Sequence, residues 1–186
     1  MSVFPDCHLC EIINLRTLNY LMEEKMFSFR RVFPSYKWED VWYVNQIIKM
    51  DNVVDRNVLG FETGVPQETI NSGDAAIKKW IDEHLDRCSC LILFVGEETY
   101  KSDWVHYEIT QASKLGKGRF IIYLDGLRDL WGNESQIGPD PYRYWGMYVP
   151  YGTPGAYCIK SYKWNEDNGL KNIASWIEDA CQRAGK

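Results

Sequence analysis

The segment KSDWVHYEI, residues 101–109, places a carboxylate four positions after an indole. Residues four apart share one face of an α-helix, so Trp104 and Glu108 are expected to lie one above the other. A carboxylate beside a large aromatic ring is partly desolvated, as a site acid must be. Glu108 is therefore either an ordinary solvated acid of a surface helix or an acid aimed at a positively charged group.

Short apolar strands alternate with amphipathic helices around this segment. Strands are predicted at RRVFPSY (30–36), NVLGFET (57–63), CLILFVG (90–96), RFIIYLDG (119–126) and AYCIKSYKW (156–164). Helices are predicted at 38–50, 73–88, 103–115 and 170–184, with Ser72 as the N-cap of the second and a polar loop at 62–73. CLILFVG is uninterruptedly apolar, which is typical of a central strand buried on both faces.

The alternation predicts an α/β fold: a doubly wound, mainly parallel five-stranded sheet covered by helices on both faces, in three layers. In such sheets ligands bind at the carboxyl ends of the strands, where the strand order reverses. Two loops qualify, PSYKWED (34–40) and GEETYKSD (96–103). Glu108 follows the second of them by little more than one helical turn, with Trp104 and Tyr107 expected to flank it. The hypothesis is a site acid, Glu108, with Trp104 and Tyr107 touching the substrate.

Composition limits the partners. The chain has 186 residues and a formal net charge of -5, which argues against non-specific nucleic-acid binding. No run of about 18 apolar residues is present, and the start of the chain does not have the pattern of a secretion signal. We expect a cytoplasmic protein with neither a membrane nor a nucleic-acid partner.

Two segments stand apart from the strand and helix pattern. Residues 1–25 are predicted to be an N-terminal extension, dispensable for a domain at 26–186, because polar residues interrupt their apolar spacing. Residues 126–155 are rich in Gly, Pro and aromatic residues. Long loops in compact domains tend to be functional, so this segment is expected to close over the carboxyl edge of the sheet and to shape the pocket.

The chain has six cysteines, which we expect to be free thiols. CHLC at 7–10 has the spacing of metal ligands, but no second pair stands at a matching spacing, so no metal site is expected. Neither a G-x-G-x-x-G nor a G-x-x-x-x-G-K-[ST] motif is present, which disfavours a Rossmann dinucleotide site and a P-loop nucleotide triphosphatase.

Several segments resemble Toll/interleukin-1 receptor (TIR) domains. RRVFPSYKWEDV (30–41) is similar to their first strand and the loop after it, where Ser, an aromatic residue and an acidic pair follow. SGDAAIKKWIDEHLDRCSCLILFVGEETYKSDWVHYEI (72–109) has the Gly before a helix, the apolar strand, and then Tyr, Ser, Trp and Glu. WGNESQIGPDPYRYWG (131–146) resembles the TIR-like subunit of bacterial Thoeris anti-phage systems.

This resemblance implies a flavodoxin-like fold and an enzyme that cleaves NAD at the nicotinamide–ribose bond. NAD would be the substrate, and no cofactor is implied. The product would be a cyclic ADP-ribose type signal, made after phage infection, that switches on a separate effector protein. The catalytic glutamate of the family corresponds to Glu108, and Ser35 and Tyr36 correspond to the loop at the nicotinamide end of the pocket. Pro34 departs from the usual apolar residue and lacks a backbone N–H.

One carboxylate suffices for this chemistry. Nicotinamide leaves a cationic pyridinium as a neutral molecule, so no general acid is required. The transition state resembles an oxocarbenium ion, which an anion beside the ribose stabilises. Exclusion of water decides whether the cation is hydrolysed or captured within the molecule as a ring.

Two other functions fit parts of the pattern. One is a non-catalytic TIR-type adaptor that self-associates through the 62–73 loop and exposed helices, in which Glu108 could be changed freely. The other is an enzyme like the nucleoside deoxyribosyltransferases, which share the fold and a glutamate that attacks ribose. It explains neither the spacing of Trp104 and Glu108 nor the GPDPYRYWG stretch at 138–146.

Overall fold

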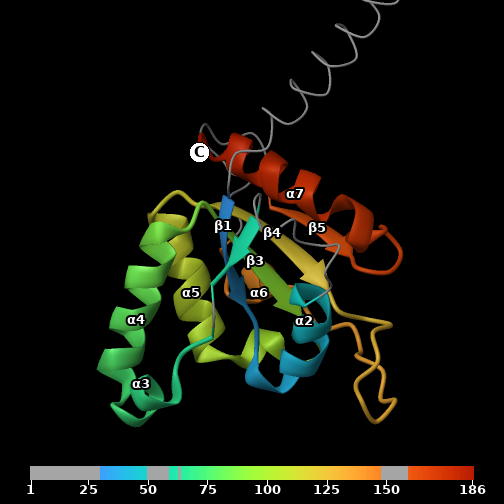
Figure 1. The fold of residues 1–186 in the computed structure, drawn as a ribbon, viewed down its shortest axis with the longest axis horizontal. Helices are drawn as coiled ribbons and strands as arrows, with labels where there is room; N and C mark the ends of the chain where they lie inside the picture. Colours follow the sequence, from blue (N-terminus) through green and yellow to red (C-terminus); the bar gives the residue numbers. More distant parts are fainter. Residues whose placement is uncertain (1–29, 50–58, 63, 148–158) are drawn as a thin grey trace, which may run out of the picture.

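A computed structural model describes residues 30–49, 59–62, 64–147 and 159–186. Within these ranges the chain forms one five-stranded sheet, in the order β2-β1-β3-β4-β5, with every neighbouring pair parallel (Figure 1). The strands are β1 (Arg30–Ser35), β2 (Leu59–Phe61), β3 (Cys90–Val95), β4 (Gly118–Tyr123) and β5 (Lys160–Lys163). This is the flavodoxin-like strand order, which confirms the predicted α/β class.

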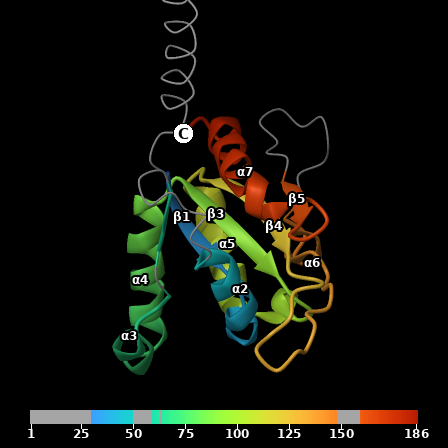
Figure 2. The same cartoon turned by 45° about the vertical axis from the view of Figure 1, so that its right-hand side comes forward.

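Helices cover both faces of the sheet, as a doubly wound fold requires. The long helices α4 (Asp74–Arg87) and α5 (Asp103–Lys114) lie on one face, and α2 (Val41–Ile48) and α7 (Gly169–Arg183) lie on the other (Figures 1 and 2). The shorter helical segments are η1 (Trp38–Asp40), α3 (Gln67–Asn71), η2 (Thr99–Lys101) and α6 (Pro141–Tyr144). The molecule therefore has the three predicted layers.

The sheet separates two apolar cores. In β3 all six residues are buried. Ile92 and Phe94 pack toward α2 and α7, whereas Leu91, Leu93 and Val95 pack toward α4 and α5. A strand buried on both faces has no polar side, which explains the continuous apolar run. Each such side chain contributes about 1.5–3 kcal/mol when fully buried, so β3 is the centre of the fold, as predicted.

Pro34 fits β1 because β2 is short. The Val32 carbonyl accepts a hydrogen bond from the backbone N–H of Glu62, so the polar backbone groups of Val32 face β2. Backbone groups alternate between the two sides of a strand, and the Pro34 nitrogen therefore faces the same side. The pairing with β2 covers Arg30 to Val32 only, so a missing N–H at Pro34 breaks no bond of the ladder. Among the described residues, the carboxyl end of β1 has no strand neighbour on this side.

The predicted polar loop at 62–73 was wrong in part, since it contains the short helix α3. Ser72 is the C-cap of α3, and its hydroxyl donates a hydrogen bond to the Glu68 carbonyl at 2.8 Å. Gly73, with φ of 88°, is the N-cap of α4. The chain turns sharply between the two helices and needs a left-handed backbone there, which glycine adopts without a steric penalty. The prediction that Ser72 caps α4 is therefore wrong.

The described part of the 126–155 segment lies at the carboxyl edge of the sheet. Its first half is closed by a bridge between Arg128 and Glu134, and its second half contains α6. A Cβ atom on Gly138 would lie 2.1 Å from the Gly96 carbonyl oxygen, so this segment touches the backbone that leaves β3. Its expected place in the fold is confirmed, and residues 148–155 lie outside the described ranges.

Other predictions concern residues outside those ranges. The extension 1–25, with Cys7 and Cys10, belongs to the part of the chain that the structure does not describe. Cys88, Cys90 and Cys181 are buried free thiols. Among the described helices, none has the length and apolar character that crossing a membrane would need.

Candidate active site

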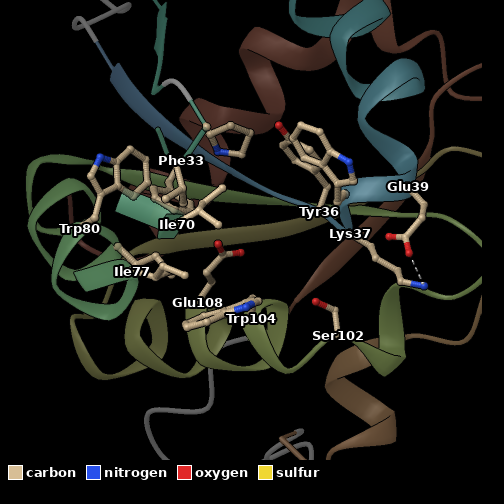
Figure 3. Close-up of a pocket in the computed structure, with 15 residues that line it drawn as sticks. Phe33, Tyr36, Lys37, Glu39, Ile70, Ile77, Trp80, Ser102, Trp104 and Glu108 are labelled. Atoms are coloured by element: carbon tan, nitrogen blue, oxygen red, sulfur yellow. Dashed lines mark ion pairs between the residues drawn. The ribbon is translucent and has the colours of Figure 1, made fainter. Parts of the chain in front are cut away.

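A cavity of about 350 Å³ opens between the carboxyl end of β1 and the helices α3, α4 and α5 (Figure 3). It lies where the strand order reverses between β1 and β3, the place at which open α/β sheets bind ligands. Most of its lining is apolar or aromatic: Phe33, Pro34, Trp38, Val65, Ile70, Ile77, Trp80, Ile81 and Trp104. Gly64 and the polar residues Tyr36, Lys37, Glu39, Ser102 and Glu108 complete it.

The Glu108 carboxyl group points from α5 into this cavity (Figure 3). The residue is only 9% exposed, and its Oε2 accepts a hydrogen bond from the Ser35 hydroxyl at 2.6 Å. Burial raises the pKa of Glu108 to about 8, and the bond from Ser35 acts in the opposite direction. Glu108 is therefore not a solvated surface acid. At neutral pH, burial therefore favours the neutral acid in the folded protein.

Helix α5 fixes the direction of this side chain. The helix begins after Ser102, whose hydroxyl accepts the backbone N–H of Val105 at 3.3 Å. Val105 and Ile109 are fully buried against the sheet, so the helix cannot rotate without exposing them. Trp104 and Glu108 then share the side that meets the cavity, as their spacing predicts.

Tyr107 does not line the cavity. Its hydroxyl donates a hydrogen bond to Asp82 of α4 at 3.0 Å and accepts one from Gln111 at 2.9 Å. It borders a separate groove between α4 and α5, together with Asp74 and Lys78. One residue is about 100° around a helix, so a neighbour of Glu108 in sequence faces elsewhere. Tyr107 was expected to contact the substrate, but its side chain faces Asp82 and not the cavity that contains Glu108. This expectation is therefore corrected.

Ser35 and Tyr36 end up in different places. Tyr36 lines the cavity. Its pKa is raised mainly by burial and to a smaller extent by the negative charge of the nearby Glu108. Ser35 is fully buried and is not among the residues that line the cavity. Its hydroxyl reaches the carboxyl group of Glu108, and the expectation that Ser35 lines the pocket does not hold.

Sequence reasoning missed most of the apolar wall. Ile70 belongs to the unpredicted helix α3, and Ile77 and Trp80 of α4 were not singled out as site residues from the sequence. Trp38 lies at the cavity with 75% of its surface exposed. A tryptophan just after a strand end, in a loop already singled out, is the signal that could have identified it.

Among the described residues that line the cavity, Lys37 is the one cationic residue. Its Nζ lies 3.3 Å from carboxylate oxygens of both Glu39 and Glu98, so two acids already offset its charge. Among the described residues the Glu108 carboxyl group forms no ion pair, because its hydrogen-bond partner is a neutral hydroxyl. The charge of Lys37 is therefore not directed at Glu108.

The 126–147 stretch contributes no residue to the lining of this cavity. Trp145 stacks on His106 of α5 with ring centroids 4.5 Å apart, and Ser135 borders a separate hollow beside Asp40. The expectation that this segment shapes the Glu108 pocket is therefore wrong for residues 126–147, which lie outside the cavity lining. Across the described ranges, no three His, Cys, Asp or Glu side chains are grouped so that they could hold a metal ion.

Two comparisons with known proteins identify the family of this chain. Over 122 residues the chain is 28% identical to a Bacillus cereus (strain MSX-D12) protein named "Putative cyclic ADP-D-ribose synthase ThsB1". The alignment covers 63% of this chain and 63% of that relative, so the chain spans less than two thirds of the relative's length. Residues 33–129 match the family described as Thoeris protein ThsB, TIR-like domain. This match covers more than half of the chain and contains both Ser35 and Glu108, so the chain belongs to the ThsB TIR-like domain family of Thoeris proteins.

Proposed function

We propose that this protein cleaves NAD at the nicotinamide–ribose bond and closes the remaining ADP-ribose into a cyclic signal for anti-phage defence. The observation that carries the proposal is the buried Glu108 carboxyl group, which points into an apolar cavity at the switch point of the sheet. The name of the Bacillus cereus relative supports the same activity. Family membership supports a role in Thoeris defence, where the product would act on a separate effector protein.

The cavity suits the nicotinamide end of NAD. Its aromatic walls, among them Phe33, Tyr36 and Trp104, offer flat apolar surface to a planar pyridinium ring. The pyridinium is a cation, and a nearby cation favours the charged form of a carboxyl group. Substrate binding would therefore lower the pKa of Glu108, so that Glu108 releases its proton to water and becomes a carboxylate beside the ribose.

The chemical step then needs only this charge. The bond between the ribose C1′ and the ring nitrogen breaks, and nicotinamide leaves with the electron pair as a neutral molecule. The carboxylate of Glu108 stabilises the oxocarbenium ion that develops at the ribose. A nitrogen or oxygen atom elsewhere in the same molecule captures C1′, loses a proton and closes the ring. Water would give linear ADP-ribose instead, so apolar walls favour the cyclic product.

The test is NAD turnover by Glu108→Gln. Glutamine has the shape of the protonated acid but cannot become an anion, so cleavage should fall by about a hundredfold or more. Folding should be preserved, because the native side chain is itself mainly neutral in the empty site. The matched control is Glu83→Gln, which changes an exposed acid on α4. NAD loss and cyclic product should be measured both with purified protein and in cells exposed to phage.

The control separates the proposal from the adaptor alternative. Glu83→Gln should retain the activity of the unchanged protein in both assays. If Glu108→Gln also protects cells from phage and yields as much product, the proposed enzyme is wrong. A non-catalytic, self-associating adaptor would then be the better explanation.

A further inference from the structure

We propose that Ser35 is a positioning residue for Glu108, which holds one carboxyl oxygen from behind so that the other oxygen faces the cavity. This inference rests on the proposed function, since it assigns the task for which the carboxyl group is held. It replaces the expectation that Ser35 touches the substrate. Three observations support this role of Ser35.

The first observation is the geometry of the contact. The Ser35 hydroxyl donates to Oε2 of Glu108 at 2.6 Å, and the two residues come from β1 and α5. Ser35 is the last residue of β1 and pairs with Leu93 in the central strand. A donor on a paired strand is rigid, so the bond fixes the carboxyl plane more firmly than a loop residue would.

The second observation is burial. Ser35 is 0% exposed and lies outside the cavity lining, whereas Glu108 is part of that lining. A substrate in the cavity would meet the carboxyl group with Ser35 on its far side. Within the described ranges, Oε1 of Glu108 forms no hydrogen bond, while Oε2 is occupied by Ser35. Oε1 is thus the oxygen left for the ribose.

The third observation concerns the charges of the described residues that line the cavity. The titratable residues that line the cavity besides Glu108 are Tyr36, Lys37 and Glu39, all from the segment after β1. Lys37 is paired with Glu39 and Glu98, and the lining residues from α3 and α4 are apolar. The Ser35 bond is therefore the main local interaction that favours the anion. A hydroxyl can also accept a hydrogen bond, so it stays a partner when the acid is protonated.

The experiment compares Ser35→Ala with the unchanged protein, with Ser35→Thr as the conservative variant. Losing a hydrogen bond to a charged group should lower kcat about tenfold at pH 7 and leave KM nearly unchanged. The acidic limb of the pH–activity profile should move upward by about one pH unit. Ser35→Thr keeps the hydroxyl and should restore the profile. Ser135→Ala, at another buried serine that does not line the cavity, is the control for loss of a buried hydroxyl.

A second measurement does not depend on NAD. The carboxyl carbon of Glu108, labelled with ¹³C and assigned through Glu108→Gln, can be titrated by NMR in the empty protein. The Glu108 titration should move to higher pH in Ser35→Ala and stay in place in Ser135→Ala. If the titration moves but the unchanged protein never consumes NAD, the link between Ser35 and Glu108 holds and the proposed function fails. An unmoved titration, or a rise in KM alone with Ser35→Ala, would overturn the positioning role.

Discussion

Trp104 of α5 forms one wall of the cavity that contains the Glu108 carboxyl group. Glu108 lies one helical turn after Trp104 on the same helix. The indole thus lies beside the place where a charge would develop, and it covers that place from one side. Trp104 also borders the groove between α4 and α5, so this residue lines both the cavity and a second open surface. Its size, rather than any hydrogen bond, is the property that matters.

Replacing Trp104 with Leu should change which product is formed. The smaller side chain opens the wall between cavity and groove, and water gains access to the oxocarbenium ion. We expect total NAD cleavage to fall about tenfold or less and the fraction of linear ADP-ribose to rise severalfold. Chromatography of the products from one reaction measures both. Trp104→Phe keeps an aromatic wall, so its ratio of linear to cyclic product should lie between those of the unchanged protein and Trp104→Leu. An unchanged ratio in Trp104→Leu would contradict this role of Trp104.

The raised pKa of Glu108 predicts how stability depends on pH. The folded protein holds this proton up to about pH 8, whereas the unfolded chain releases it near the ordinary value of 4.5. Between these values the folded state binds more protons, so the contribution of Glu108 to the free energy of unfolding decreases as pH rises. The decrease is at most about 1.4 kcal/mol per pH unit, and it stops above about pH 8.

Glu108→Gln cannot titrate and should remove this decrease. The thermal midpoint of Glu108→Gln, relative to that of the unchanged protein, should therefore rise steadily from pH 5 to pH 8 and then level off. Glu83→Gln should show no such trend. A constant difference between Glu108→Gln and the unchanged protein would mean that Glu108 is charged in the folded state throughout this range.

Gly138→Ala should loosen the 126–147 stretch without touching the cavity. The new methyl group would lie 2.1 Å from the Gly96 carbonyl oxygen, which is backbone and cannot turn away. We expect a loss of about 1–3 kcal/mol in the free energy of unfolding, measured by urea denaturation. NAD cleavage per folded molecule should change less than threefold, because this stretch does not line the cavity. A much larger loss of activity at full folding would show that the stretch acts on the site.

Local patterns in the sequence specify the layers of the fold and the helix face on which Glu108 lies. The apolar run at 90–96 predicts a strand buried on both faces because a continuous apolar pattern has no side to show to water. The four-residue spacing of Trp104 and Glu108 predicts a shared helix face for an equally local reason. Such patterns act over one or two turns or strands, and they can be read without knowing the rest of the chain.

The surroundings of Glu108, in contrast, depend on contacts between segments that are distant in sequence. Ser35 lies 73 residues away in sequence and reaches Glu108 because β1 and the start of α5 meet at one edge of the sheet. Tyr107, next to Glu108 in sequence, turns toward Asp82 instead. Helix α3 and its Ile70 complete the apolar wall from a segment predicted as loop. Burial of the carboxyl group, and with it the pKa of about 8, comes from this assembly of distant segments. Desolvation depends on everything that packs around a group, so no local pattern determines it.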